Sequence, residues 1–178
     1  STSVALAKEK PWIEGWLGFR AALRFEGKAM RHDVRVRLET IIQRLKPSDL
    51  LHQARAIVLS GANNGWDIVD GDPDDDDVMK PWQKASLMAQ EVGRFLAQDS
   101  ETRKHFLVEL IAASNQQRAF ECGVGLAEGT ADLLELWREI IAEFAQIDPN
   151  KRNATVLGGY IYHAHQRDAT FTMSVLES

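Results

Sequence analysis

The sequence contains one cysteine and no long apolar run. A lone cysteine, Cys122, cannot form an internal disulfide, which agrees with a reducing compartment. No window approaches the roughly 18 uncharged apolar residues of a membrane span, and the first residues lack the apolar core of a signal peptide. We therefore expect a cytoplasmic protein with no membrane segment.

The sequence motifs of catalysis are also missing. There is no phosphate-binding P-loop, no nucleophile elbow and no Gly-x-Gly-x-x-Gly. The apolar neighbours of Cys122 favour a buried residue over a nucleophile. His163 and His165 are the only close histidine pair, and on a helix residues two apart point about 200° away from each other, so they cannot chelate one ion. The sequence predicts no catalytic residue and no cofactor, and we expect the chain not to be an enzyme.

Strand-like alternation is absent, and apolar residues recur at helical spacing along nearly the whole chain. The sequence therefore predicts an all-α fold. The strongest apolar stripe places Trp137 with Leu133 and Ile140, so we expect Trp137 to be buried. Caps, glycines and prolines predict helices within 11–30, 31–46, 48–60, 81–99, 100–114, 116–129, 130–148, 150–168 and 170–178.

Three glycines suggest an internal repeat. Gly93, Gly123 and Gly158 can be aligned with spacings of 30 and 35 residues, and each is followed three residues later by Leu or Ile. Such spacing is typical of stacked antiparallel helical hairpins, in which a small residue lets two helices approach closely. The pattern predicts a degenerate HEAT- or TPR-like repeat array, and an irregular helical bundle is the alternative.

These patterns divide the chain into an N-terminal helix set at 1–60, an acidic linker loop at 61–80 and repeat-like helical hairpins at 81–178. Seven aspartates lie between Asp67 and Asp77. Carboxylates this close repel one another, which favours an exposed, hydrated segment. We expect Trp66 and Trp82 to anchor this segment by docking on the flanking helices.

The acidic segment has a second interpretation, as a divalent-metal site. An EF-hand loop needs oxygen ligands at positions 1, 3 and 5, a glycine at 6 and a glutamate at 12. Counting from Asp70, the first three positions fit, but Asp75 and Pro81 stand where the glycine and the glutamate should be. A metal-dependent enzyme or metal-binding domain is therefore an alternative function, with the candidate ligands Asp70, Asp72, Asp74 and Asp76.

Charge is divided unevenly along the chain. Residues 1–60 carry eleven Lys or Arg against six Asp or Glu, a net +5, and residues 61–178 carry ten against twenty, a net −10. Five cations recur every three or four residues, but Gly27 is expected to interrupt the stripe that they would form. Together with nearby aromatic residues they offer a nucleic-acid-binding alternative. The candidate partner-binding residues are Arg20, Arg24, Lys28, Arg31 and Arg35.

Apolar and glycine placements over most of the chain carry a resemblance to a known family. They occur in GWLGFRAALRFEGKAM, RLETIIQRLKPSDLLHQARAIVLSG, GWDIVDGDPDDDD, EVGRFLAQD and GVGLAEG. These segments resemble the helical region that follows the ATPase domain in large bacterial P-loop NTPases of the signal-transduction type, some of them associated with phage defence. The resemblance implies a sensor or scaffold, and none of the family's nucleotide-binding residues has a counterpart here.

The resemblance and the missing catalytic motifs together predict a non-catalytic helical scaffold or sensor module. The expected partner is a protein or another domain of the same polypeptide, and nucleic acid is not the expected partner. The first residue is not Met, and an apolar helical pattern is still running at the last residues. We therefore expect the chain to belong to a larger bacterial protein.

Overall fold

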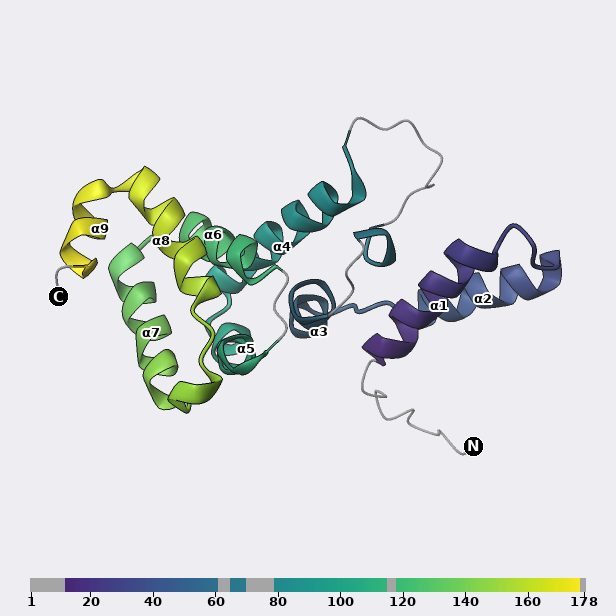
Figure 1. Ribbon diagram of the computed structural model, residues 1–178, viewed down its shortest axis with the longest axis horizontal. Helices are drawn as coiled ribbons and strands as arrows, with labels where there is room; N and C mark the ends of the chain where they lie inside the picture. Colours follow the sequence, from purple (N-terminus) through teal and green to yellow (C-terminus); the bar gives the residue numbers. More distant parts are fainter. Residues whose placement is uncertain (1–11, 61–64, 70–78, 115–117, 177–178) are drawn as a thin grey trace, which may run out of the picture. The chain divides into compact units, whose positions relative to one another are not determined.

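The computed structural model describes residues 12–60, 65–69, 79–114 and 118–176 (Figure 1). These residues form nine α-helices and no strand, which confirms the predicted all-α fold. None of the described helices is both long and apolar enough to cross a membrane. The helices are α1 (Ile13–Glu26), α2 (His32–Leu45), α3 (Leu50–Ala54), α4 (Pro81–Gln98), α5 (Ser100–Ala112), α6 (Ala119–Gly129), α7 (Leu133–Gln146), α8 (Thr155–Arg167) and α9 (Ala169–Leu176).

The chain divides into two compact units, Ser1–Ser48 and Asp49–Ser178. Residues 49–60, which were predicted to belong to the N-terminal helix set, are grouped with the second unit by their contacts. Here α3 and the π-helical turn Arg55–Leu59 contact α4, and Val58 is fully buried.

In the first unit, α1 and α2 form a helical hairpin. Trp16 and Ile42 are buried, as their helical stripes predict. The helical periodicity of residues 31–46 predicts that Val34 and Ile41 are buried with Ile42, but they are 45% and 40% exposed. The apolar stripe of α2 therefore spans a broader arc than α1 covers.

In the second unit, α4, α6 and α8 lie side by side in one layer with α6 in the middle, and α5 and α7 lie on one side of this layer (Figure 1). The middle helix, AFECGVGLAEG, is rich in small residues. Small residues let helix backbones approach closely, so α6 can be contacted at short range from both sides.

Gly93 and Gly125 make the contact between α4 and α6. A Cβ built on Gly93 would lie 2.3 Å from the carbonyl oxygen of Cys122, and one on Gly125 would lie 1.9 Å from that of Gln90. Real Cβ atoms do not approach other atoms this closely, so neither position can carry a side chain unless the helices move apart.

Gly123 and Gly159 make the corresponding contact between α6 and α8. A Cβ on Gly123 would lie 2.2 Å from the carbonyl oxygen of Val156, and one on Gly159 would lie 1.9 Å from that of Phe120. The predicted role in helix contact is thus confirmed for Gly93 and Gly123. It is wrong for Gly158, which is exposed, because consecutive helical residues point about 100° apart and spacing alone cannot choose between two adjacent glycines. Whether the hairpins are repeats or an irregular bundle stays a prediction.

The helices α5 and α7 supply several of the large core side chains. The helical periodicity of residues 100–114 predicts four buried residues on α5, and all are at most 1% exposed, namely Phe106, Leu107, Leu110 and Ile111. On α7, Leu136 and Ile140 are buried, whereas Trp137 is only half-buried and its ring stacks on Tyr160 with the centroids 5.9 Å apart. The expected full burial of Trp137 is therefore wrong.

The predicted linker at 61–80 is described only at 65–69 and 79–80. Gly65–Asp67 forms a 3-10 turn, and Ile68 and Val69 are buried, which differs from the exposed segment expected there. Trp82 is 60% exposed in the first turn of α4, so its predicted docking is wrong. The side chain of Trp66 lies outside the described ones.

The glycine contacts predict opposite effects of one substitution at two sites. Gly125→Ala should lower the free energy of unfolding by about 3 kcal/mol, because the new methyl must push α4 and α6 apart. Gly158→Ala is the matched control and should raise it by about 0.5–1 kcal/mol, because this position is open and alanine loses less backbone entropy in a helix. Urea denaturation followed by circular dichroism measures both values. Equal effects at the two positions would contradict the close contact.

Candidate functional site

The predicted basic residues do not form one helical stripe. They are divided among α1, the connection after it and α2: Arg20, Arg24, Lys28, Arg31 and Arg35. The guanidinium carbon of Arg20 lies 5.0 Å from the ring centre of Trp16, and that of Arg24 lies 4.3 Å from the ring centre of Phe25. The predicted interruption after Gly27 is confirmed, because α1 ends at Glu26.

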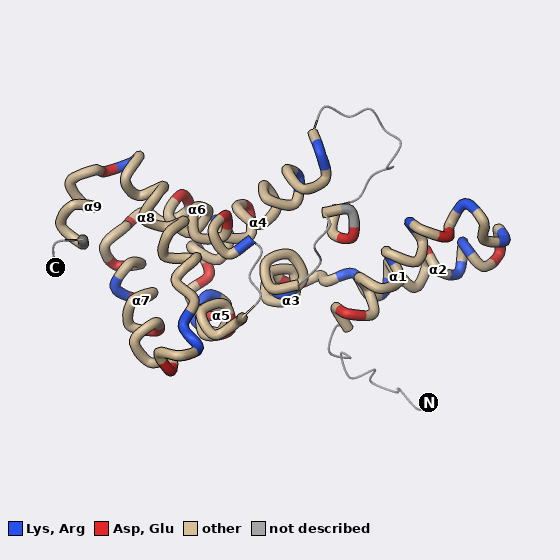
Figure 2. The backbone as a smooth tube through the Cα atoms, viewed as in Figure 1, with Lys and Arg blue, Asp and Glu red and all other residues tan. Residues whose placement is uncertain are grey.

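Two of these cations form ion pairs with carboxylates close by in sequence. Arg31 Nη2 lies 2.7 Å from Asp33 Oδ2, and Arg35 Nε lies 2.9 Å from Glu39 Oε1 one helical turn later. Both pairs are exposed, so each contributes little to stability. Part of the positive charge that a phosphate backbone would require is therefore balanced by carboxylates of α2, which lie among the basic residues (Figure 2).

The candidate metal ligands Asp70, Asp72, Asp74 and Asp76 lie outside the described residues. Among the residues that are described, no group of three or more His, Cys, Asp or Glu could hold a metal ion. His163 is half-buried and His165 is exposed on α8. The metal-site interpretation of the acidic segment stays a prediction.

Cys122 lies on α6 and is fully buried, as its apolar neighbours predict. Burial, together with the smaller effect of the nearby Glu121 carboxylate, raises the pKa of its thiol to about 12. A thiol with this pKa is not ionised at neutral pH and is a poor nucleophile.

Many of the aspartates cap helix N-termini. The backbone N–H of His52 donates to Asp49 at 3.1 Å, that of Thr102 to Asp99 at 3.1 Å, and those of Leu134 and Glu135 to Asp132 at 2.9 Å. The N–H of Phe171 donates to Asp168 at 3.0 Å. These carboxylates satisfy backbone donors that a helix leaves unpaired, and so they have a structural role.

Arginines make the matching contacts at helix C-termini. Arg103 donates to the carbonyl of Leu96 at 3.0 Å and of Ala97 at 2.7 Å, at the end of α4. Arg152 donates at 2.7 Å to two carbonyls at the end of α7, and Arg167 donates at 2.9 Å to that of Thr130, just after α6. A guanidinium at this end of a helix pairs free carbonyls and complements the helix dipole. Sequence reasoning missed these contacts because the arginines lie on other segments of the chain.

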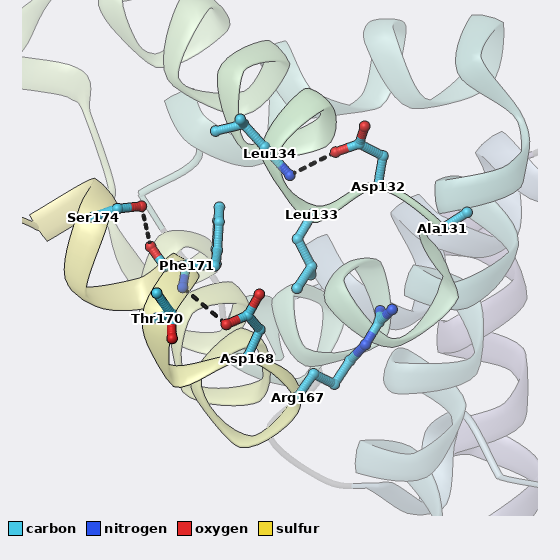
Figure 3. A pocket seen from close by; sticks show the side chains of 9 residues that line it. All are labelled: Ala131, Asp132, Leu133, Leu134, Arg167, Asp168, Thr170, Phe171 and Ser174. Atoms are coloured by element: carbon cyan, nitrogen blue, oxygen red, sulfur yellow. Dashed lines mark hydrogen bonds between the residues drawn. The ribbon is translucent and has the colours of Figure 1, made fainter.

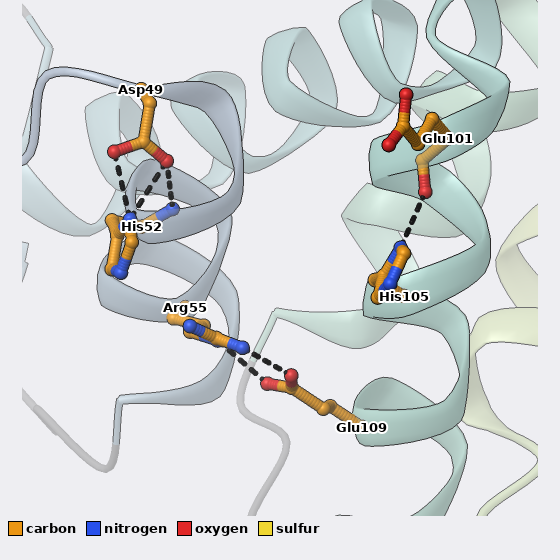
Figure 4. Close-up of polar contacts among 6 residues, drawn as sticks. All are labelled: Asp49, His52, Arg55, Glu101, His105 and Glu109. Atoms are coloured by element: carbon orange, nitrogen blue, oxygen red, sulfur yellow. Dashed lines mark hydrogen bonds and ion pairs between the residues drawn. The ribbon is translucent and has the colours of Figure 1, made fainter. Parts of the chain in front are cut away.

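Figure 4 shows further polar contacts around α3 and α5, among them that of His105 with the carbonyl oxygen of Glu101, 2.9 Å from its Nδ1. The ring Nδ1 of His52 lies 2.7 Å from Asp49, and Arg55 donates from Nε to Glu109 at 2.8 Å in a bidentate pair that joins the π-helical turn to α5. The Asp49–His52 pair lies within the N-terminal turn of α3, whereas the Arg55–Glu109 pair links two helical segments. They form no constellation with a nucleophile among the described residues.

One cleft of about 680 Å³ lies where the start of α7 meets the turn between α8 and α9 (Figure 3). Leu133 and Phe171 belong to its apolar lining, and Asp132, Arg167 and Asp168 supply its charges. These three charged side chains already bond the backbone at helix ends, as described above. The cleft therefore offers a polar rim but no group poised for catalysis among its described residues.

The other candidate is the outer face of the α4–α6–α8 layer, on the side away from α5 and α7. On α6 the exposed and half-buried residues Phe120, Glu121, Val124 and Glu128 recur at helical spacing, opposite the buried Leu126. The ring of Phe120 contacts that of Tyr162 on α8 with the centroids 5.7 Å apart. The two rings are 40% and 55% exposed.

Hydrogen bonds across this face join α4 to α6. Ser86 donates to Glu121 Oε1 at 3.1 Å, and Gln90 donates to Glu128 Oε2 at 2.7 Å. From the first pair to the second, the residue numbers increase along both helices, so α4 and α6 run parallel. The face is therefore a fixed surface with exposed aromatic rings and carboxylates. The sequence does not predict it, because its residues come from three helices that are separated along the chain.

No family model, no curated protein and no solved structure matches this chain.

The cap of α3 predicts a pH-dependent stability. Partial burial raises the pKa of Asp49, but hydrogen bonds from the backbone and ring of His52 lower it more, so it lies below its ordinary value of 3.8. The cap's stabilisation is present above about pH 4 and is lost as the pH falls through the folded-state pKa. Asp49→Ala should cost about 1 kcal/mol at pH 7, and this difference should shrink at pH 3 in urea denaturation.

Asp49→Asn is the conservative control. Asparagine also caps helices, so this variant should keep most of the stability at pH 7. Its stability relative to the unmodified protein should rise as the pH falls, because it has no proton to gain. A cost of Asp49→Ala that is the same at both pH values would contradict the assignment.

Proposed function

We propose that this chain is a non-catalytic helical scaffold or sensor module that binds a protein partner or another domain of its own polypeptide. The observation that carries the proposal is the exposed aromatic pair Phe120–Tyr162 on the outer face of the α4–α6–α8 layer. Exposed aromatic side chains held on a rigid surface are typical of protein interfaces.

The use of the charged groups supports the same function. The described aspartates and arginines that could serve a reaction instead bond helix ends, as Asp132 and Arg103 do. Arg103 also donates to Glu139 at 3.1 and 2.7 Å, which ties α5 to α7. These contacts stabilise a fixed arrangement of helices, which suits a scaffold.

The proposal includes the wider context implied by the resemblance: a bacterial P-loop NTPase whose ATPase domain precedes this region, acting in the cytoplasm. The test is to read the complete open reading frame and to assay the complete protein and this chain for ATP hydrolysis. We expect an in-frame P-loop upstream, hydrolysis by the complete protein, and none by this chain. An open reading frame without a P-loop, or hydrolysis by this chain alone, would contradict the proposal.

The metal-dependent alternative is tested separately by calorimetric titration of this chain with Ca²⁺, Mg²⁺ and Mn²⁺. The scaffold proposal predicts no saturable heat. Saturable binding that disappears when Asp70, Asp72, Asp74 and Asp76 are all changed to serine would favour the metal site instead.

A further inference from the structure

We propose that the exposed side of α2 binds an acidic amphipathic helix of a protein partner, with Leu or Ile along one face and Asp or Glu beside it. The inference goes beyond the proposed function, because this surface lies on the first unit and the aromatic pair Phe120–Tyr162 lies on the second. Two features of α2 carry it: an apolar stripe at heptad spacing, and the exposed Arg37 and Arg44 beside that stripe.

The α2 stripe consists of four apolar residues at spacings of four, three and four, namely Val34, Leu38, Ile41 and Leu45. This spacing is the heptad pattern by which one helix packs along another. Val34 and Ile41 are exposed, and Leu38 and Leu45 are half-buried, so α1 covers only part of the stripe. From Val34 to Leu45 the stripe is about 17 Å long, which matches about three turns of a second helix.

Arg37 and Arg44 lie along one edge of the α2 stripe. Both side chains are exposed, and Ile41 lies four residues after Arg37 and three before Arg44, so all three share one side of the helix. Neither arginine forms an ion pair or a side-chain hydrogen bond within the described part of the chain. Asp33 is one turn before Arg37, but it pairs with Arg31 instead. The stripe therefore has two unpaired guanidinium groups at its edge.

The first unit as a whole is positively charged. Residues 12–48 contain eight Lys or Arg and four Asp or Glu, a net charge of +4. Two of the four carboxylates, those of Asp33 and Glu39, already form ion pairs. Charged residues beside an apolar seam determine which helix pairs with it, and Asp or Glu opposite Arg37 and Arg44 would balance their charge. Charge complementarity therefore selects an acidic helix.

Two other occupants fit α2 less well. A second copy of the chain would bring a second first unit with the same net charge of +4, and an antiparallel pair of α2 helices would place Arg37 of one copy beside Arg44 of the other. Nucleic acid would pair with the arginines but would leave the α2 stripe uncovered, because phosphates do not bind apolar side chains. In addition, α2 has no Phe, Tyr or Trp on which a base could stack.

The test uses two synthetic helical peptides of about 18 residues with Leu at heptad spacing, one with Glu and the other with Lys at the flanking positions. Fluorescence anisotropy measures the binding of each peptide to the unmodified chain and to four variants. Val34→Ser removes an exposed residue of the α2 stripe. Val36→Ser is its matched control, because Val36 is also 45% exposed on α2 but points to the other side of the helix.

The other two variants reverse charges. Arg37→Glu combined with Arg44→Glu changes the edge of the α2 stripe. Lys104→Glu combined with Arg138→Glu is the control, which makes the same change in net charge at exposed positions of α5 and α7. Circular dichroism verifies that each variant is folded, and sedimentation velocity gives its oligomeric state.

We expect the Glu peptide to bind, and the Lys peptide to bind about tenfold more weakly or not at all. The affinity for the Glu peptide should fall about tenfold in Val34→Ser and in the double arginine variant, and stay unchanged in both controls. The double arginine variant should also bind the Lys peptide more tightly. No saturable binding of the Glu peptide, equal binding of the two peptides, or equal effects of Val34→Ser and Val36→Ser would each overturn the proposal.

Two further results would overturn it by assigning α2 to another occupant. A dimer that dissociates in Val34→Ser would assign the stripe to a second copy. Displacement of the Glu peptide by single-stranded DNA that binds Val34→Ser as tightly as the unmodified chain would assign α2 to nucleic acid. None of these results would alter the reading-frame and hydrolysis test, so failure of this inference can be told apart from failure of the proposed function.

Discussion

The close approach of three helix backbones is the constraint on which the second unit depends. Gly125 and Gly123 lie on different sides of α6, and each faces a backbone carbonyl of the neighbouring helix. At this range a helix cannot slide or rotate against its neighbour without a steric clash. The contact is made by backbone atoms, and glycine has no side chain that could change its conformation to relieve the clash. The positions of α4 and α8 are thus set relative to α6, and with them the positions of the residues on the outer face.

The same constraint fixes the relative positions of the side chains on the outer face. Ser86 and Gln90 on α4 donate hydrogen bonds to carboxylates of α6, and the ring of Phe120 contacts that of Tyr162.

Charged groups elsewhere in the unit cap the helices. A helix leaves its last carbonyls and first N–H groups unpaired, and arginines and aspartates satisfy many of them here. Because many charged side chains pair with helix ends, a chain with 26% charged residues can lack an evident catalytic constellation among its described residues.

The sequence predicts the helices well because each one must bury an apolar stripe, and its period of about 3.6 residues can be read directly. The four buried residues of α5 follow from that period, whereas the contacts of Gly93 and Gly123 were predicted from the spacing of the glycines. Periodicity alone does not predict burial where the position of a neighbouring helix determines which side chains are covered. Phe95 continues the apolar pattern of α4 but is 51% exposed, because α5 and α6 do not cover that side. For the same reason the pattern could not choose between Gly158 and Gly159.

The candidate site was less predictable than the fold. Arg167 lies 37 residues from Thr130, whose carbonyl it pairs, and Phe120 lies 42 residues from Tyr162. Contacts between residues this far apart leave no local signal in one sequence.

Native-state amide hydrogen exchange tests the central claim, that α6 is held in a fixed position between α4 and α8. The amides from Cys122 to Leu126 should exchange only through global unfolding of the second unit, with the same denaturant dependence as that unfolding. Exchange of these amides through local opening, at a free energy well below the global value, would contradict it.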